Sequence, residues 1–208
     1  MLGENPFVMN TQKLLSILEY VHLYLPWIEE VSRFDDILRK SGQELQVLRK
    51  HGICHLHIGL ESGNEEVLLK MNKGVTVQQG NEACCMLQRA GITYSFTAIP
   101  GLGGAELSDA HARDTAAFIN ATNPARVWLM GLKVWENTPL YEMCEKGEFH
   151  PLSLEARLQE VIKIVENLES FEGIFADTTV MDKYTIMGSF PKDKEQVLKL
   201  LRQCATLN

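Results

Sequence analysis

Segments that favour strands alternate with segments that favour helices along this chain of 208 residues. Short apolar runs rich in Val, Ile, Phe, Thr and Tyr predict strands at 28–34, 54–60, 94–100, 126–134 and 173–180. Between them, apolar residues recur every three or four positions, as in LSLEARLQEVIKIVENLES at 152–170. Such alternation is typical of βαβ units, in which helices connect parallel strands and cover the sheet. The sequence therefore predicts an α/β fold with a parallel sheet.

Start and stop signals bound the expected helices. Ser41 and Glu44 fit a capping box. Thr76 precedes an apolar stripe that ends at a glycine, and we also expect Thr11 and Ser108 to act as N-caps. The expected helices lie at 11–25, 35–52, 64–74, 76–91, 107–124, 152–170 and 192–208.

The number of strands limits the architecture. About five strands are too few for a complete eight-stranded barrel, which typically needs about 250 residues. No linker, low-complexity stretch or repeat divides the chain. We therefore expect one domain over 1–208, in which a core at 1–149 is followed by C-terminal helices and a last strand at 150–208.

The chain carries 27 acidic and 20 basic residues, a formal net charge of -7. This balance disfavours broad binding to nucleic-acid phosphates. No apolar run approaches the ~18 residues that span a bilayer, and residues 1–10 lack the features of a signal peptide. We therefore expect a cytoplasmic protein that has no membrane partner.

The five cysteines are scattered, and they form neither a disulfide framework nor a CxxC or CxxxCxxC metal motif: Cys54, Cys84, Cys85, Cys144 and Cys204. His55 and His57 share one face of a strand and can bind a metal, but such pairs more often pack under helices or line a cleft. No metal ligand is assigned. His111 is expected to be solvated on an outer helix.

Ligands meet parallel sheets at the carboxyl ends of the strands, which makes three segments of this chain candidates for a site. They are GLESG at 59–63, IPGLGG at 99–104 and WENTPL at 135–140. Glu61 in the first segment also suits the N-terminus of a following helix, and glycine-rich loops often serve only as turns. The occurrence of three such segments in one sheet favours a functional site.

The order of these motifs resembles the radical S-adenosylmethionine (radical SAM) superfamily. The resemblance is carried by HLHIGLESGNEEVLLKMNKGVTVQQGNEACCMLQRAGITYSFTAIPGLGG and by ENTPLYEMCEKGEF, and it weakens after residue 149. The chain is most similar to the branch of elongator, methylthiotransferase and anaerobic coproporphyrinogen oxidase proteins. The resemblance implies a partial parallel (β/α) barrel of the radical SAM type that is missing its first strands.

In that family a CxxxCxxC loop holds a [4Fe-4S] cluster, and SAM bound to the cluster yields a 5′-deoxyadenosyl radical that abstracts hydrogen from substrate. Matched residue by residue, Glu61 corresponds to a carboxylate that contacts the ribose or methionine of SAM, with Ser62 beside it. Glu4 lies in a segment similar to the Gly-Gly-Glu element that holds the methionine amino group. No catalytic residue is assigned.

The same matching gives a prediction for the adenine side of SAM. Ile99 and Gly101 correspond to a motif on the fifth strand of the family's barrel that supports adenine, and Val134 falls where the sixth-strand backbone touches it. A glutamate often ends the fifth-strand motif, whereas Gly104 stands at that position here.

The resemblance implies part of a radical SAM enzyme, in which the cluster ligands belong to the full-length protein and this chain alone is inactive. An upstream CxxxCxxC is then expected. One alternative is a non-catalytic SAM-barrel-like binding or interaction module. Another is a metal-free α/β lyase that uses Lys133 or Glu136 at a strand end.

The expected partners are a small-molecule or unknown substrate and a second copy of the chain. Without the first barrel strands, the strand near 31–34 is expected to have an unpaired edge. Such edges favour self-association, unless residues 1–26 cover this one. The sequence leaves the substrate and the reaction open.

Overall fold

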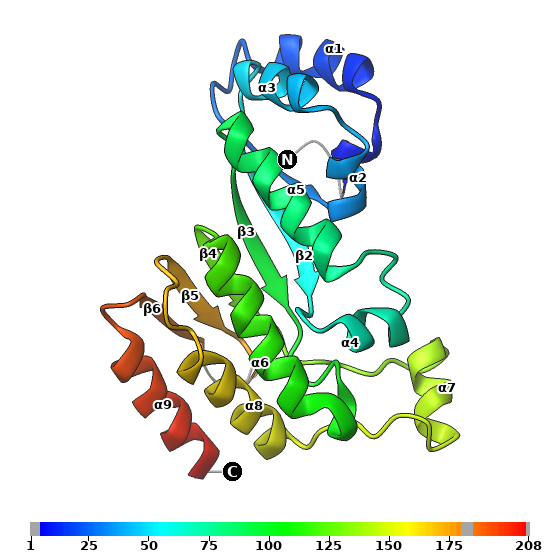
Figure 1. The fold of residues 1–208 in the computed structure, drawn as a ribbon, viewed down its shortest axis with the longest axis vertical. Coiled ribbons are helices and arrows are strands. Elements are labelled where there is room, and N and C mark those ends of the chain that lie inside the picture. Colours follow the sequence, from blue (N-terminus) through cyan, green and yellow to red (C-terminus); the bar gives the residue numbers. More distant parts are fainter. Residues whose placement is uncertain (1–4, 180–184, 207–208) are drawn as a thin grey trace.

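A computed structural model of the chain describes residues 5–179 and 185–206. In this part of the chain six strands form one sheet in the order β1-β2-β3-β4-β5-β6 (Figure 1). The first five strands run parallel, and β6 pairs antiparallel with β5. The strands are β1 Ile28–Ser32, β2 Ile53–Glu61, β3 Thr93–Ala98, β4 Arg126–Leu129, β5 Ile174–Asp177 and β6 Ile186–Ser189. The predicted α/β fold with a partial parallel barrel-type sheet is confirmed.

The helices α5, α6, α8 and α9 form a layer over one face of the sheet (Figure 1). None of the described helices has the length and apolar character needed to cross a bilayer. The helical elements are η1 Pro6–Val8, α1 Thr11–Val21, α2 Phe34–Leu38, α3 Gly42–Lys50, α4 Glu65–Lys70, α5 Val77–Ala90, α6 Gly104–Thr122, α7 Pro139–Glu145, α8 Leu154–Glu166 and α9 Lys194–Thr206.

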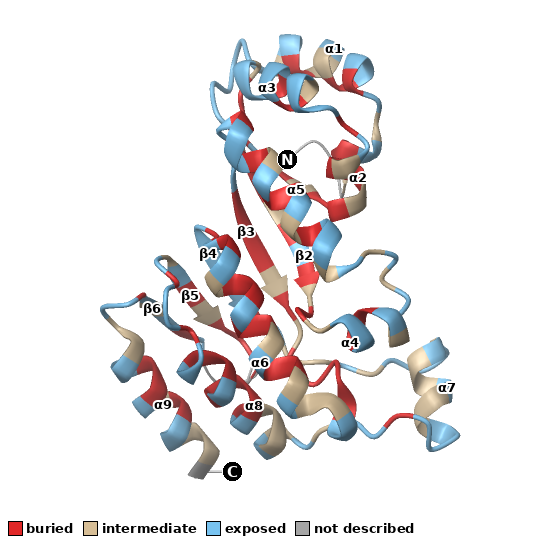
Figure 2. Ribbon diagram, in the orientation of Figure 1, coloured by how far each residue is buried: buried red, intermediate tan, exposed pale blue. Residues whose placement is uncertain are grey.

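The two faces of the sheet differ because side chains alternate along each strand. On β2, Leu56 and Ile58 point to the helix layer and are buried. The opposite face carries His57 on β2, Trp128 on β4 and Met187 on β6, and the last two are 50% and 61% exposed. The hydrophobic core thus lies between the sheet and the helices, where buried residues concentrate in Figure 2.

Local signals place several helix ends as expected. The capping boxes Ser41–Glu44 and Thr76–Gln79 are both present. The expected N-cap at Thr11 is wrong by one residue, because Asn10 accepts the hydrogen bond from the backbone of Lys13.

Three expectations near the carboxyl ends of the strands are wrong. Helix α6 begins at Gly104 and not after Ser108, because the Ser108 hydroxyl turns towards Glu160 of α8. His111, a residue of this helix, is fully buried rather than solvated. The strand expected at 126–134 ends at Leu129, so Val134 lies in an irregular segment.

The short elements η1, α7 and β6 were not predicted from the sequence. Pro139 of the WENTPL segment occupies the first turn of α7, whose N-cap is Thr138. Strand β6 follows a segment that is not described, and its four residues carry too short a pattern for recognition.

Strand β1 pairs with β2 on one side and has no second strand partner among the described residues. The N-terminal turn η1 packs against β1 through Phe7, which is 1% exposed. Asn5 donates a hydrogen bond to Asp36 (2.7 Å), and Lys40 donates one to the carbonyl of Met9 (2.8 Å). Part of the N-terminal segment is thus held beside this edge, and self-association stays a prediction.

A buried polar network links the ends of β2 and β3 to the helix layer. The Ser62 hydroxyl lies 2.8 Å from Nδ1 of His111 on α6. Nε2 of His111 lies 3.7 Å from Oε1 of Glu160 on α8, and both side chains are fully buried. The same Glu160 oxygen accepts a hydrogen bond from the backbone of Gly101 (2.6 Å). These contacts resemble a Ser-His-Glu triad, but burial excludes substrate, so their role is to hold the two loops.

Burial controls the protonation of this network. It lowers the pKa of His111 to about 4 and raises the pKa of Glu160 to about 7, although hydrogen bonds from Ser108 and Gly101 oppose the second shift. His111 is therefore neutral at pH 7, and its contact with Glu160 is not an ion pair at that pH.

We predict that Glu160→Gln makes the free energy of unfolding less dependent on pH. Glu160 binds its proton more tightly in the folded chain than in the unfolded chain, where its pKa is the ordinary 4.5. Its protonation therefore contributes fully to the free energy of unfolding below pH 4.5, and this contribution is lost as the pH rises to about 7. Urea unfolding of both proteins at pH 5, 6 and 7 measures this. Burial also raises the pKa of Asp177 to about 6, so Asp177 changes the free energy of unfolding with pH in the same direction. Asp177 is present in both proteins and therefore does not contribute to the difference between them. Identical slopes in the two proteins would refute the assignment.

Candidate functional site

Four of the six predicted site residues meet at the carboxyl ends of β2 and β3. Glu61 ends β2, and its carbonyl accepts a hydrogen bond from the backbone of Ile99 (3.0 Å), which follows β3. Ser62 and Gly101 continue the two loops from there. Parallel pairing explains this meeting, since both strands end at the same edge of the sheet.

Glu61 is held in an unusual conformation. Its φ of 64° lies in the left-handed region, which costs on the order of 1 kcal/mol for a residue with a side chain. Its carboxylate turns back over Gly59, where a Cβ atom would collide with Oε1 of Glu61. Strained backbone of this kind is common at functional sites.

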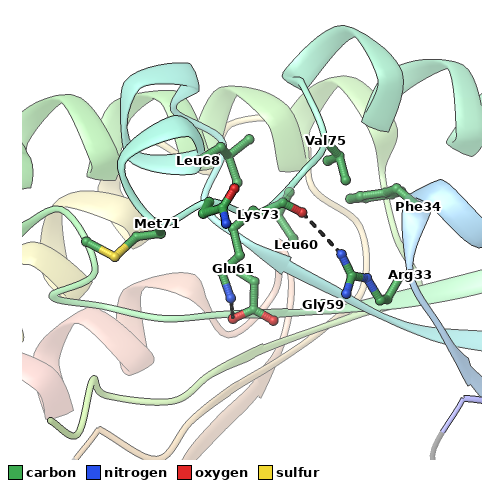
Figure 3. A pocket seen from close by; sticks show the side chains of 10 residues that line it. Arg33, Phe34, Gly59, Leu60, Glu61, Leu68, Met71, Lys73 and Val75 are labelled. Atoms are coloured by element: carbon green, nitrogen blue, oxygen red, sulfur yellow. Dashed lines mark hydrogen bonds and ion pairs between the residues drawn. The ribbon is translucent and has the colours of Figure 1, made fainter. Parts of the chain in front are cut away.

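A pocket of about 330 Å³ opens beside Glu61 (Figure 3). Lys73 approaches Oε2 of Glu61 at 3.6 Å, and Arg33 donates a hydrogen bond to the carbonyl of Lys73 at 3.2 Å. Phe34 and Val75 provide an apolar wall. One carboxylate beside two cations suits a ligand that carries both charges or several hydroxyl groups.

Ser62 and Gly101 are both buried behind this edge. The Ser62 side chain is fully buried and faces His111. It therefore holds the turn after β2 in place and does not reach the open edge of the sheet. Gly101 has a φ of 90°, which favours glycine, and a Cβ atom there would lie 3.1 Å from the Arg157 side chain. Arg157 also donates a hydrogen bond to the carbonyl of Leu132 (2.6 Å). Helix α8 therefore holds the glycine-rich loop and the segment after β4 together.

The remaining predicted residues are not brought to this edge by regular structure. Glu4 lies outside the described residues, and Val134 sits in the irregular segment after β4. Lys133, the nucleophile of the alternative lyase, is exposed and lies over the ring of Trp135, 3.9 Å from its centroid. A Schiff-base lysine is activated by desolvation or a cationic neighbour, so this setting gives that alternative no support.

A larger cleft of about 600 Å³ runs along the sheet face opposite the helices. Its apolar wall includes Trp128, Ile174 and Met187, and its polar wall includes His57 and Arg126. Sequence reasoning did not identify these residues apart from His57, although the period of two along each strand places them on the same face.

The cysteines do not form a cluster site in the described structure. They lie on β2, α5, α7 and α9, far apart in the order of elements. Among the described residues, three potential metal ligands come within 4.8 Å of one another at Glu29, His55 and His57. The cysteines present do not fit a [4Fe-4S] cluster, which needs several thiolates on one preorganised loop.

No family model matches the chain. Two curated relatives are both described as tRNA uridine(34) acetyltransferase. The protein from Methanocaldococcus infernus is 28% identical over 131 residues, and that from Methanocaldococcus jannaschii is 27% identical over 129 residues. Each match covers 62% of this chain but only 24% and 23% of the relatives, so the chain spans about a quarter of their length.

Three solved structures share the fold. They are the archaeal Methanocaldococcus infernus Elp3 with an N-terminal deletion (TM-score 0.57, 23% identity), methylornithine synthase PylB (0.59, 17%) and the [FeFe]-hydrogenase maturase HydG (0.54, 11%). The matches cover 74%, 80% and 82% of this chain, and 35%, 45% and 39% of those chains.

All three are radical SAM proteins, and both curated relatives are of the Elp3 kind. The order of the motifs, the open parallel sheet and the relatives agree, and the chain resembles the radical SAM superfamily in sequence and fold.

Proposed function

We propose that this chain is the part of a radical SAM enzyme that binds SAM at the carboxyl ends of β2 and β3. The observation that carries the proposal is the junction of Glu61 with the 99–104 loop. It places a carboxylate that pairs with Lys73 next to a glycine-rich loop at the carboxyl ends of two parallel strands. SAM offers a positively charged amino acid portion, ribose hydroxyls and a flat adenine, which these groups suit.

In this assignment, Glu61 accepts hydrogen bonds from the ribose or the methionine amino group. Ile99, Gly101 and Val134 support adenine, and Glu4 holds the methionine end. Ser62 and Glu160 act indirectly, because their buried hydrogen bonds orient the two loops.

In the family, SAM together with a [4Fe-4S] cluster supplies radical hydrogen abstraction. Because the described cysteines do not fit a cluster, we propose that other residues of the full-length enzyme hold it and that this chain alone is inactive. The same observation favours, as a second candidate, a module that binds SAM without catalysis. A cytoplasmic location is part of the proposal.

The substrate is proposed to occupy the cleft on the open face of the sheet. About 600 Å³ bordered by Trp128, Ile174 and Met187 suits a molecule that has an aromatic or aliphatic part. Arg126 at its border can pair with an anionic group.

We predict that Glu61→Gln weakens binding of S-adenosylhomocysteine and SAM by about tenfold or more, because a hydrogen bond to a charged group contributes about 1.5–3 kcal/mol. Isothermal titration calorimetry on the 208-residue chain measures this. Glu66→Gln on α4 is the matched control, since Glu66 is an exposed carboxylate on the neighbouring helix. Equal affinities for the two variants would contradict the proposal.

We predict that Gly59→Ala reduces the affinity for SAM several-fold with little change in stability. The new Cβ atom displaces only the flexible end of Glu61, so the carboxylate moves while the strand stays paired. Urea unfolding should change by less than about 1 kcal/mol. Unchanged SAM affinity in a correctly folded variant would show that the position of Glu61 is not important.

A further inference from the structure

Glu29, His55 and His57 form a compact cluster on the open face of the sheet, away from the buried network. Glu29 is on β1 and both histidines are on β2, with Glu29 opposite His55 and Val31 opposite His57 in the register. Their potential ligand atoms all lie within 4.8 Å of one another. Two strands therefore bring together one carboxylate and two imidazoles, a ligand set typical of Zn²⁺ and other divalent transition metals.

One distance within the cluster is already close to that in a metal site. Nε2 of His57 lies 3.1 Å from Oε2 of Glu29. In a tetrahedral zinc site with bonds of about 2.0–2.1 Å, neighbouring ligand atoms are about 3.3 Å apart. The pair thus stands close to the spacing that a shared ion requires.

The hydrogen bonds of His55 fix its tautomer. The Thr93 hydroxyl donates its one hydrogen to the carbonyl of Cys54 (3.0 Å) and must therefore accept from Nδ1 of His55, 2.7 Å away. The lone pair of His55 then lies on Nε2, where the Ser95 hydroxyl lies at 2.7 Å. A ring N–H held by an outer hydrogen bond, which leaves the lone pair on the other nitrogen, is the usual arrangement of a metal-binding histidine.

We propose that Glu29, His55 and His57 bind a divalent transition-metal ion such as Zn²⁺, with the fourth position directed to the cleft. His57 and Arg126 border both the cluster and the cleft. In the bound state, the proton of the His57 ring lies on Nδ1, and the ion replaces the hydrogen bonds of Nε2 to Glu29 and of Ser95 to His55. Arg126, 3.8 Å from Glu29, is the competing cation, and its half-exposed side chain can turn away.

The test is competition between the 208-residue chain and a chromophoric chelator for Zn²⁺. Glu29→Gln and His57→Asn should each weaken the affinity by at least about tenfold, since loss even of outer-shell partners costs about 10–100-fold. His51→Asn is the matched control, because His51 lies at the end of α3 and all five cysteines remain in every variant. Circular dichroism without metal checks folding.

The variant Arg126→Gln should change the affinity for Zn²⁺ in the opposite direction. Removal of a positive charge near Glu29 should tighten Zn²⁺ binding several-fold, which adventitious binding to thiols would not show. The proposal is overturned if Glu29→Gln, His57→Asn and His51→Asn bind Zn²⁺ equally, or if Arg126→Gln has no effect. Neither outcome depends on SAM binding.

Discussion

The parallel pairing of β2 with β3 is the constraint on which the rest of the structure depends. Leu56 and Ile58 pair in register with Tyr94 and Phe96, and all four are buried beneath the helix layer. Because this face is buried under the helices, the opposite face of both strands lies towards the cleft. The pairing also makes the strands end together, so that Glu61 and the glycine-rich loop meet at the same edge of the sheet.

The buried network then determines how precisely the loops are held. His111 and Glu160 come from α6 and α8, yet they reach Ser62 and Gly101 at the two strand ends. Breaking the Ser62–His111 or the Gly101–Glu160 hydrogen bond would leave buried polar groups unpaired at a cost of about 1–3 kcal/mol each, which favours one mutual arrangement of loops and helices. The helix layer thus both covers the core and positions the candidate site.

Local patterns in the sequence predict much of this arrangement, because caps and strand alternation depend on neighbouring residues. Ser41, Thr76 and the GLESG motif are of this kind, and they lie where expected. His111 could not be placed in this way, since its burial follows from α8 packing on α6, and a histidine on a helix reads as polar. Similarly, Glu29 joins His55 and His57 only through the pairing of β1 with β2, which local sequence does not reveal.

The central claim is that SAM binds where the ends of β2 and β3 meet. Hydrogen–deuterium exchange of the 208-residue chain with and without S-adenosylhomocysteine tests it most directly. We expect slower exchange in peptides that cover 59–63 and 99–104, and no change in α1, which is remote from the site. Unchanged exchange in both peptides at a saturating ligand concentration, or protection confined to other segments, would contradict the account.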